Sequence, residues 1–449
     1  MTEILGNAAV FTLGCRLNQA DSALICDRLK SDGWEIVRPE YAGHIDLLII
    51  NTCTVTAAAS RKSRQAARRF RSKHPGACLL VTGCSAEIEN SAWNKEEAVD
   101  IILTNPEKKE ISSLVKDFLQ KKTISSGHTF SIDQPLEIFK EKVGGNFPFK
   151  SRAFLKVQEG CNNFCTYCIV PYARGPERSR DWDEVIADFK QFIENGFEEI
   201  VLTGVNICAY NDRGRTLNEL IGALCSIPGY FRIRLSSTEP HPNNMDLLKT
   251  MAENPKVCRF LHLSLQHGCD EILKAMGRKY TTVEFARFIE EARRLIPGIH
   301  LGTDIIIGFP GETEEYFEQE IEFVKKMNFS NIHIFTYSRR EKTPAAAMPD
   351  QVPGNIANER RLRLLKIADT MKTDFVKSQL GKTLPVLFER KNKNGCFQGW
   401  SDNYINFICD DSRIKKHVIT QVKAIEITDD NSIRGKLLSS FRNSTPDGL

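Results

Sequence analysis

The chain has 449 residues, 41% of them hydrophobic and 26% charged, and a formal net charge of only +4. This length exceeds what one hydrophobic core usually holds, so two or three domains are expected. No apolar run approaches the ~20 residues of a membrane span, and no basic segment leads into an apolar core at the N-terminus. These features argue against membrane and secreted classes and predict a cytoplasmic protein, whose 14 cysteines indicate metal or redox chemistry rather than disulfides.

Residues 1–120 alternate strand-like apolar runs with helical patterns. Residues 8–13, 47–50 and 79–82 are strand candidates, and residues 20–30 form a predicted helix. Such alternation is typical of a parallel sheet with helices on its faces. The pattern fades after about Val115, and the Gly- and Ser-containing stretch 121–146 is predicted to be a linker.

One stretch of this region is strongly basic. Residues 61–73 contain seven Lys or Arg and no Asp or Glu. In a helix, Arg61, Arg64, Arg68 and Arg71 would lie along one face. That face is either an ordinary solvated surface or a surface that tracks the phosphates of a nucleic acid.

From residue 147 to residue 378 the alternation has a longer period. Six successive βα units predict an incomplete (β/α)6 barrel, whose chemistry would lie at the carboxyl ends of its strands. Residues 379–445 differ, because alternating apolar residues, an Asn-Gly turn and aromatic-rich segments predict a small five-stranded β-barrel. The expected fold class is therefore α/β with a C-terminal β module. The six barrel strands are expected at residues 154–158, 200–203, 232–236, 261–265, 303–307 and 332–337.

Three cysteines follow the first of these six strands. Cys161, Cys165 and Cys168 form a CxxxCxxC pattern, which supplies thiolates to three irons of a cubane cluster and leaves the fourth iron open. Structural zinc is the alternative, but it prefers four ligands in two close pairs, and the chain has no second CxxC. The pattern therefore favours an iron–sulfur site with an open position for a substrate-like molecule.

These cysteines lie within longer motifs. Residues 158–175 read QEGCNNFCTYCIVPYARG, residues 202–206 read LTGVN and residues 303–313 read TDIIIGFPGET. The chain thereby resembles the methylthiotransferase family of radical S-adenosylmethionine (SAM) enzymes, nearly end to end. This resemblance implies that SAM binds the open iron of a 4Fe–4S cluster and is cleaved reductively to a 5′-deoxyadenosyl radical, a chemistry that the cofactor supplies.

The resemblance also implies a second 4Fe–4S cluster, which handles the sulfur to be inserted. Its ligands would be Cys15, Cys53 and Cys84, each of which ends or closely follows a predicted strand. Parallel strands would bring these thiols to one edge of a sheet, whereas each cysteine taken alone would more simply be a core residue. For SAM, the superfamily and the strand ends suggest these contacts: Tyr167, Thr203, Gly204, Ser237, Glu239, Gln266, Asp304 and Gly308.

Within the family, the chain most resembles the enzymes that use two SAM molecules to convert N6-threonylcarbamoyladenosine, at position 37 beside the tRNA anticodon, to its 2-methylthio derivative. The C-terminal module resembles a TRAM domain, an RNA-binding barrel in which Arg390 and Lys391 would contact phosphate. In this context the basic face from Arg61 to Arg71 is interpreted as a tRNA-binding surface. The implied partners are tRNA, an electron donor of the flavodoxin or ferredoxin type and a sulfur donor.

Three other functions remain as alternatives. The family also contains enzymes that act on isopentenyladenosine in tRNA and on an aspartate of a ribosomal protein, and a non-catalytic iron–sulfur sensor is a third possibility. Two positions depart from the family pattern. His267 replaces the serine of a usual Gln-Ser-Gly sequence, and Lys342 stands where glycine is common, so substrate contacts or loop shape would differ there.

Overall fold

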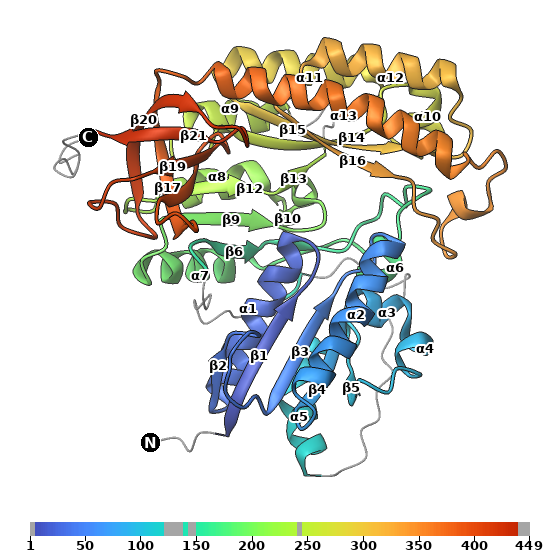
Figure 1. Ribbon diagram of the computed structural model, residues 1–449, viewed down its shortest axis with the longest axis vertical. Coiled ribbons are helices and arrows are strands. Elements are labelled where there is room, and N and C mark those ends of the chain that lie inside the picture. Colours follow the sequence, from blue (N-terminus) through green and yellow to red (C-terminus); the bar gives the residue numbers. More distant parts are fainter. Residues whose placement is uncertain (1–4, 121–137, 142–149, 240–244, 439–449) are drawn as a thin grey trace.

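The computed structural model describes residues 5–120, 138–141, 150–239 and 245–438, which fold into three parts in chain order (Figure 1). These parts are an α/β domain, an open barrel and a small closed β-barrel. Most of the predicted linker at 121–146 lies outside the described residues. No helix in the described part of the chain is both long and apolar enough to cross a membrane.

The N-terminal part is a parallel sheet in the order β2-β1-β3-β4-β5, which confirms the predicted architecture. Successive side chains of a strand point to opposite faces. Leu47 and Ile49 therefore pack with α1 and α5, whereas Leu48 and Ile50 pack with α2 on the other face. The elements are β1 (Gly6–Thr12), α1 (Arg16–Ser31), β2 (Trp34–Val37), β3 (Leu47–Thr52), α2 (Ala57–Lys73), β4 (Cys78–Gly83), α3 (Cys84–Ile88), α4 (Asn90–Trp93), β5 (Ile101–Ile102), η1 (Pro106–Glu110) and α5 (Ile111–Leu119).

The central part is an open barrel of parallel strands, in which all six predicted strands are present. They form two hydrogen-bonded groups, β12-β9-β6 and β13-β14-β15-β16, so β6 and β16 are end strands. Figure 1 shows the N-terminal domain directly below these strands. The strands are β6 (Ala153–Lys156), β9 (Glu199–Thr203), β12 (Arg232–Leu235), β13 (Ser237–Thr238), β14 (Phe260–Gln266), β15 (His300–Ile307) and β16 (Asn331–Thr336). The main helices are α7 (Trp182–Glu194), α8 (Leu217–Cys225), α9 (Met245–Glu253), α11 (Thr282–Leu295), α12 (Glu314–Met327) and α13 (Gly354–Lys377).

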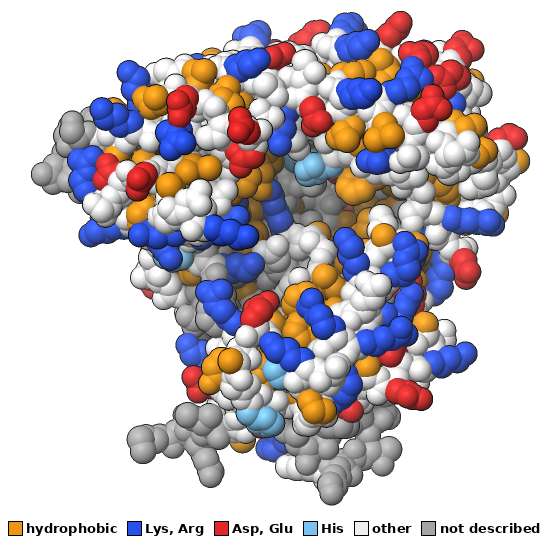
Figure 2. Space-filling view, viewed as in Figure 1, with side chains coloured by type: hydrophobic (Ala, Val, Ile, Leu, Met, Phe, Trp, Pro, Cys, Tyr) orange, Lys and Arg blue, Asp and Glu red, His pale blue; other side chains and the backbone are white. Residues whose placement is uncertain are grey.

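The two faces of these barrel strands differ in chemistry. Leu261, Leu263 and Leu265 of β14 are buried in the apolar cluster beneath the outer helices. The intervening residues of β14 therefore point to the inner face of the barrel. Asp304 of β15 and His333 of β16 lie on this inner face and are partly or largely exposed. The barrel thus presents polar side chains toward the N-terminal domain, where the surface is hollowed (Figure 2).

The C-terminal part is a closed barrel in the order β17-β18-β19-β21-β20, which confirms the predicted five-stranded module. Phe397 and Phe407 belong to its core. Tyr404 instead packs on Phe260 of β14, with ring centroids 4.8 Å apart, and Trp400 stacks on Tyr404 at 4.7 Å. These aromatic side chains thus hold the small barrel against the amino ends of the central strands. The strands are β17 (Thr383–Lys391), β18 (Phe397–Ser401), β19 (Asn406–Cys409), β20 (Ile419–Ile427) and β21 (Ile433–Leu437).

Candidate functional site

The cysteines of the CxxxCxxC pattern lie in the loop between β7 (Gln158–Glu159) and α6 (Val170–Arg174). Gly160 starts this loop at a φ of +71°, and a Cβ there would lie 1.8 Å from the Pro176 carbonyl oxygen, so only glycine fits. Burial, reinforced by the charges of neighbouring cysteines, raises the thiol pKa of Cys161 to about 11 and that of Cys168 to about 12. Cys165 is buried, and Cys161 and Cys168 are partly buried. Neighbouring thiols that would repel one another as thiolates suit a shared cationic group, and three of them fit three irons of a cubane cluster.

The second set of cysteines comes from three separate strand ends. Cys15 follows β1, Cys53 follows β3 and Cys84 follows β4, and these three strands are neighbours in the sheet. The approach is close, because a Cβ on Gly14 would lie 2.7 Å from the Cβ of Cys53. Burial, reinforced by the charges of the other two cysteines, raises the thiol pKa of Cys53 to about 11. The structure thus gathers three thiols with the same chemistry as the first set, and their ligation of a second cluster stays a prediction.

A buried network of charges joins the two cysteine sets. Arg174, at the end of α6, donates to Glu159 at 2.6 Å and to Asp21 of α1 at 3.0 Å. Arg174 and Asp21 are each only 2% exposed. Although burial would lower it, nearby cysteines and carboxylates hold the pKa of Arg174 above its usual range. One guanidinium therefore contacts both domains beside both sets. Asp21 also pairs with Lys108 at 2.8 Å and with Lys156 at 3.0 Å.

Polar side chains gather beside the first cysteine set. Glu239, which follows β13, accepts from Asn163 at 2.5 Å and pairs with Arg278 at 2.8 Å. Arg278 also donates to Cys165 Sγ at 3.2 Å and to the Ser264 carbonyl at 3.0 Å. Glu239 was expected at the SAM site, but Asn163 and Arg278 were not. Asn163 lies between two cluster cysteines in the sequence, which was a usable signal, whereas Arg278 follows α10 (Asp270–Ala275) in a segment with no recognisable motif.

Gln158 shapes the loop at the end of β9. Its Oε1 accepts the backbone N–H groups of Val205 at 2.9 Å and Asn206 at 2.8 Å. A Cβ on Gly204 would lie 2.9 Å from the Gln158 carbonyl oxygen, so glycine is required for this packing. Thr203 is buried at the end of the same strand. These contacts bring Thr203 and Gly204 to the carboxyl edge that also carries the first cysteine set.

Comparisons with known proteins identify the family of this chain. The model of the radical SAM superfamily matches residues 155–324, and that of the uncharacterized protein family UPF0004 matches residues 7–104. The threonylcarbamoyladenosine tRNA methylthiotransferase MtaB of Bacillus subtilis is 34% identical over 90% of each chain. Its namesake in Aquifex aeolicus is 38% identical over 85% of this chain and 92% of its own. The chain belongs to the radical SAM methylthiotransferase family.

Other similar proteins are named for a different modified adenosine. A tRNA-2-methylthio-N(6)-dimethylallyladenosine synthase of Wolbachia pipientis is 36% identical over 92% of this chain and 96% of its own. Sequence identity alone therefore does not separate these two kinds of methylthiotransferase. Among solved structures, the radical SAM methyltransferase TsrM from Kitasatospora setae gives a TM-score of 0.56 over 77% of each chain at 15% identity, which shows a shared fold only.

The remaining positions expected at the methylthiotransferase SAM site differ in their surroundings. Tyr167 packs against a small apolar cluster, Ser237 is exposed, and Gln266 ends β14 at a φ of +73°. Gly308 lies against a helix, and its contact with SAM stays a prediction. A Cβ on Gly308 would lie 2.7 Å from the Cβ of Ala357 in α13. Asp304 lies inside β15, away from the strand end, with two histidines.

The basic face of α2 is largely engaged within the N-terminal domain. Arg64 pairs with Glu89 at 2.6 Å and Arg68 pairs with Glu96 at 2.8 Å. Arg71 pairs with Asp100 and donates to the backbone carbonyl of Ala77, whereas Arg61 is exposed. In the C-terminal barrel, Arg390 donates to Gln398, and the Lys391 ammonium lies 4.7 Å from the centre of the Phe397 ring. Figure 2 shows Lys and Arg side chains on both sides of the hollow. RNA contact by these residues stays a prediction.

The two departures from the family pattern lie in different settings. His267 is fully buried, accepts the Cys269 N–H at Nδ1, and places Nε2 3.4 Å from both Glu312 and Glu320. Its ring therefore fills a buried polar contact with α12 and the preceding loop rather than a substrate position. Lys342 is exposed.

Proposed function

We propose that this protein inserts a methylthio group at carbon 2 of N6-threonylcarbamoyladenosine, at position 37 beside the anticodon of tRNA. The observation that carries the proposal is the pair of three-cysteine sites on facing domains, bridged by Arg174. Three thiolates would leave one iron of each 4Fe–4S cluster open. One open iron would take SAM, and the other would hold the sulfur to be inserted.

The protein's own groups position this chemistry. When bound, the clusters and two SAM molecules supply the radical and the methylthio group. Arg174 fixes the spacing of the two sites, because its guanidinium is paired in both domains. Arg278 and Glu239 hold the cysteine loop against the ends of the barrel strands. The hollow between the domains then admits an unstacked base, since tRNA loops present such bases.

Relatives support tRNA as the substrate class. Similar proteins from several bacteria are named as threonylcarbamoyladenosine tRNA methylthiotransferases or as tRNA-2-methylthio-N(6)-dimethylallyladenosine synthases. A ribosomal-protein aspartate would call for a protein docking surface instead, and basic side chains on both sides of the hollow favour a polyanion (Figure 2). We further propose a cytoplasmic location, a flavodoxin- or ferredoxin-type reductant and a separate sulfur donor.

Direct assay of the reconstituted enzyme tests this function. The protein with both clusters rebuilt anaerobically is incubated with SAM, reductant, sulfide and an anticodon stem-loop that carries threonylcarbamoyladenosine. Mass spectrometry of the nucleosides should show the 2-methylthio product, and the Cys161→Ala variant provides the background. Product only from a dimethylallyladenosine stem-loop, or only on a ribosomal protein, would overturn the proposal.

A further inference from the structure

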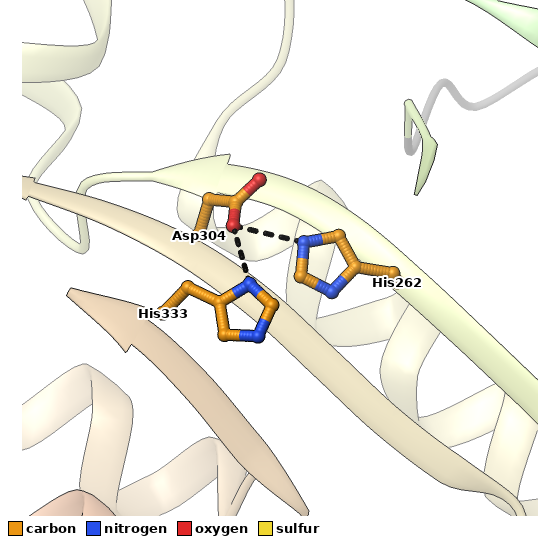
Figure 3. Close-up of side chains that lie close together, drawn as sticks. All are labelled: His262, Asp304 and His333. Atoms are coloured by element: carbon orange, nitrogen blue, oxygen red, sulfur yellow. Dashed lines mark hydrogen bonds and ion pairs between the residues drawn. The ribbon is translucent and has the colours of Figure 1, made fainter. Parts of the chain in front are cut away.

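A polar cluster on the inner face of the barrel takes no part in the contacts around the cysteines. His262 of β14 places Nε2 2.9 Å from Oδ1 of Asp304, and His333 of β16 places Nδ1 3.2 Å from the same oxygen (Figure 3). The centroids of the two imidazole rings lie 5.0 Å apart. A Cβ on Gly302 would lie 3.0 Å from His262 Nδ1, so glycine at this position leaves room for the ring. One carboxylate therefore orients two imidazoles.

The cluster retains hydrogen-bonding capacity beyond its own contacts. Although burial alone would raise it, hydrogen bonds from both histidines hold the pKa of Asp304 well below its usual range. An ionised carboxylate only accepts hydrogen bonds, so the ring nitrogens that face it are N–H groups, and each ring has a second nitrogen. The His333 side chain is 56% exposed, compared with 10% for His262. The cluster is thus open to a ligand on the His333 side.

The position of His262 along β14 places the cluster between the two cysteine sites. Phe260, two residues before it, lies 5.7 Å from the guanidinium of Arg16, which directly follows Cys15. Ser264, two residues after it, accepts from Arg278, which also contacts Cys165. Two residues of a strand span ~6.6 Å. The inner face of β14 therefore runs from the neighbourhood of one cysteine set to that of the other, with His262 midway.

We propose that His262, Asp304 and His333 bind the N6 substituent of the substrate base, and that His333 selects a threonylcarbamoyl group over a dimethylallyl group. This inference rests on the proposed function. A base held between the two cysteine sites would direct its N6 substituent at the barrel wall. The threonylcarbamoyl group offers a carboxylate, a hydroxyl and N–H groups to imidazole nitrogens and to the Asp304 carboxylate. The dimethylallyl group offers only C–H bonds.

The discrimination follows from unsatisfied polar groups. A dimethylallyl group seated on this cluster would take water from the imidazole nitrogens and the carboxylate without replacing its hydrogen bonds. A site built to hydrogen-bond its substrate strongly rejects an analogue that lacks the polar groups. An apolar pocket rejects an analogue with an added polar group far less strongly.

Binding without turnover tests this inference. The reconstituted holoenzyme is titrated anaerobically, without SAM, with anticodon stem-loops that carry threonylcarbamoyladenosine or dimethylallyladenosine, and anisotropy gives both dissociation constants. The wild type should prefer the first stem-loop by about tenfold or more, the value of one hydrogen bond to a charged group. His333→Phe should remove most of this preference by weakening only the first stem-loop. His333→Gln, which keeps hydrogen-bonding atoms, should retain part of it.

A matched control is available on the N-terminal domain. His44 forms an exposed pair with Asp46 at 3.1 Å, so His44→Phe should leave the preference unchanged. Cluster absorbance and SAM cleavage without RNA show whether each variant is intact. If the wild type prefers threonylcarbamoyladenosine and His333→Phe keeps that preference, or weakens both stem-loops equally, the inference is wrong and the proposed function stands. If the wild type modifies only dimethylallyladenosine, the proposed function itself fails.

Discussion

The two cysteine sites are built in opposite ways. Cys161, Cys165 and Cys168 lie within eight consecutive positions of one loop. The other three cysteines are separated by more than thirty residues each and meet only because β1, β3 and β4 are adjacent parallel strands. The spacing of the ligands in one site is therefore specified by a short segment, whereas the other site depends on the folding of a whole domain.

Removing one ligand from each site should separate the two halves of the reaction, and this is the largest effect that we expect. Cys161→Ala should abolish SAM cleavage, because the first cluster loses a ligand beside its open iron. Cys53→Ala should spare SAM cleavage but stop methylthio insertion. Both outcomes are measured by quantifying 5′-deoxyadenosine and the 2-methylthio nucleoside in the same reaction. Undiminished methylthio product from Cys53→Ala would rule out the two-cluster proposal.

A Gly→Ala substitution, which adds a single methyl group, should disrupt one cysteine site and leave the other intact. Gly14 has a φ of +95°, and its added Cβ would lie 2.7 Å from the Cβ of Cys53, so Gly14→Ala should displace a ligand of the second site. Gly160→Ala should damage only the first site, since its Cβ would meet the Pro176 carbonyl at 1.8 Å. Each variant should lose about half of its iron, which elemental analysis measures.

The control for these glycine variants is Gly76→Ala, because nothing lies within 4 Å of the added Cβ. It should retain full iron content. If Gly14→Ala also retained full iron content, the close packing at the second site would not determine cluster binding.

Arg174 tests whether the two sites depend on one another. Arg174→Ala would leave Asp21 and Glu159 buried without their guanidinium, and losing one partner of a buried charge pair typically costs about 3–5 kcal/mol. The free energy of unfolding, measured by urea denaturation with fluorescence detection, should fall accordingly. Arg68→Ala is the matched control, because the Arg68 side chain in its pair with Glu96 is 66% exposed. Exposed pairs contribute little. Equal stability of the two variants would contradict a structural role for the buried network.

The sequence predicts the features that a short segment specifies and misses those that depend on residues distant in the chain. The first cysteine set, the six barrel strands and the five-stranded module were predictable, because each depends on spacing or periodicity within a short segment. The grouping of Cys15, Cys53 and Cys84 required the family resemblance in addition to the strand pattern. The contacts of Arg278 and the pairing of His262 and His333 with Asp304 were not predicted, since these partners are distant in the sequence. The ion pairs of Arg64 and Arg68 were missed for the same reason, because Glu89 and Glu96 lie on a different segment from α2.

Those ion pairs lead to the smallest expected effect, on RNA binding by α2. Arg64 pairs with Glu89 just after α3, the helix that begins at Cys84, so this arginine supports the second cysteine site. Arg61 is exposed and is the better candidate for a phosphate contact. Arg61→Ala should weaken tRNA binding a few-fold and reduce the slope of log Kd against log salt by about one. Arg68→Ala should change the slope less, since Glu96 already offsets its charge. If both variants gave the same slope as the wild type, the basic face would stabilise the domain and would not bind RNA.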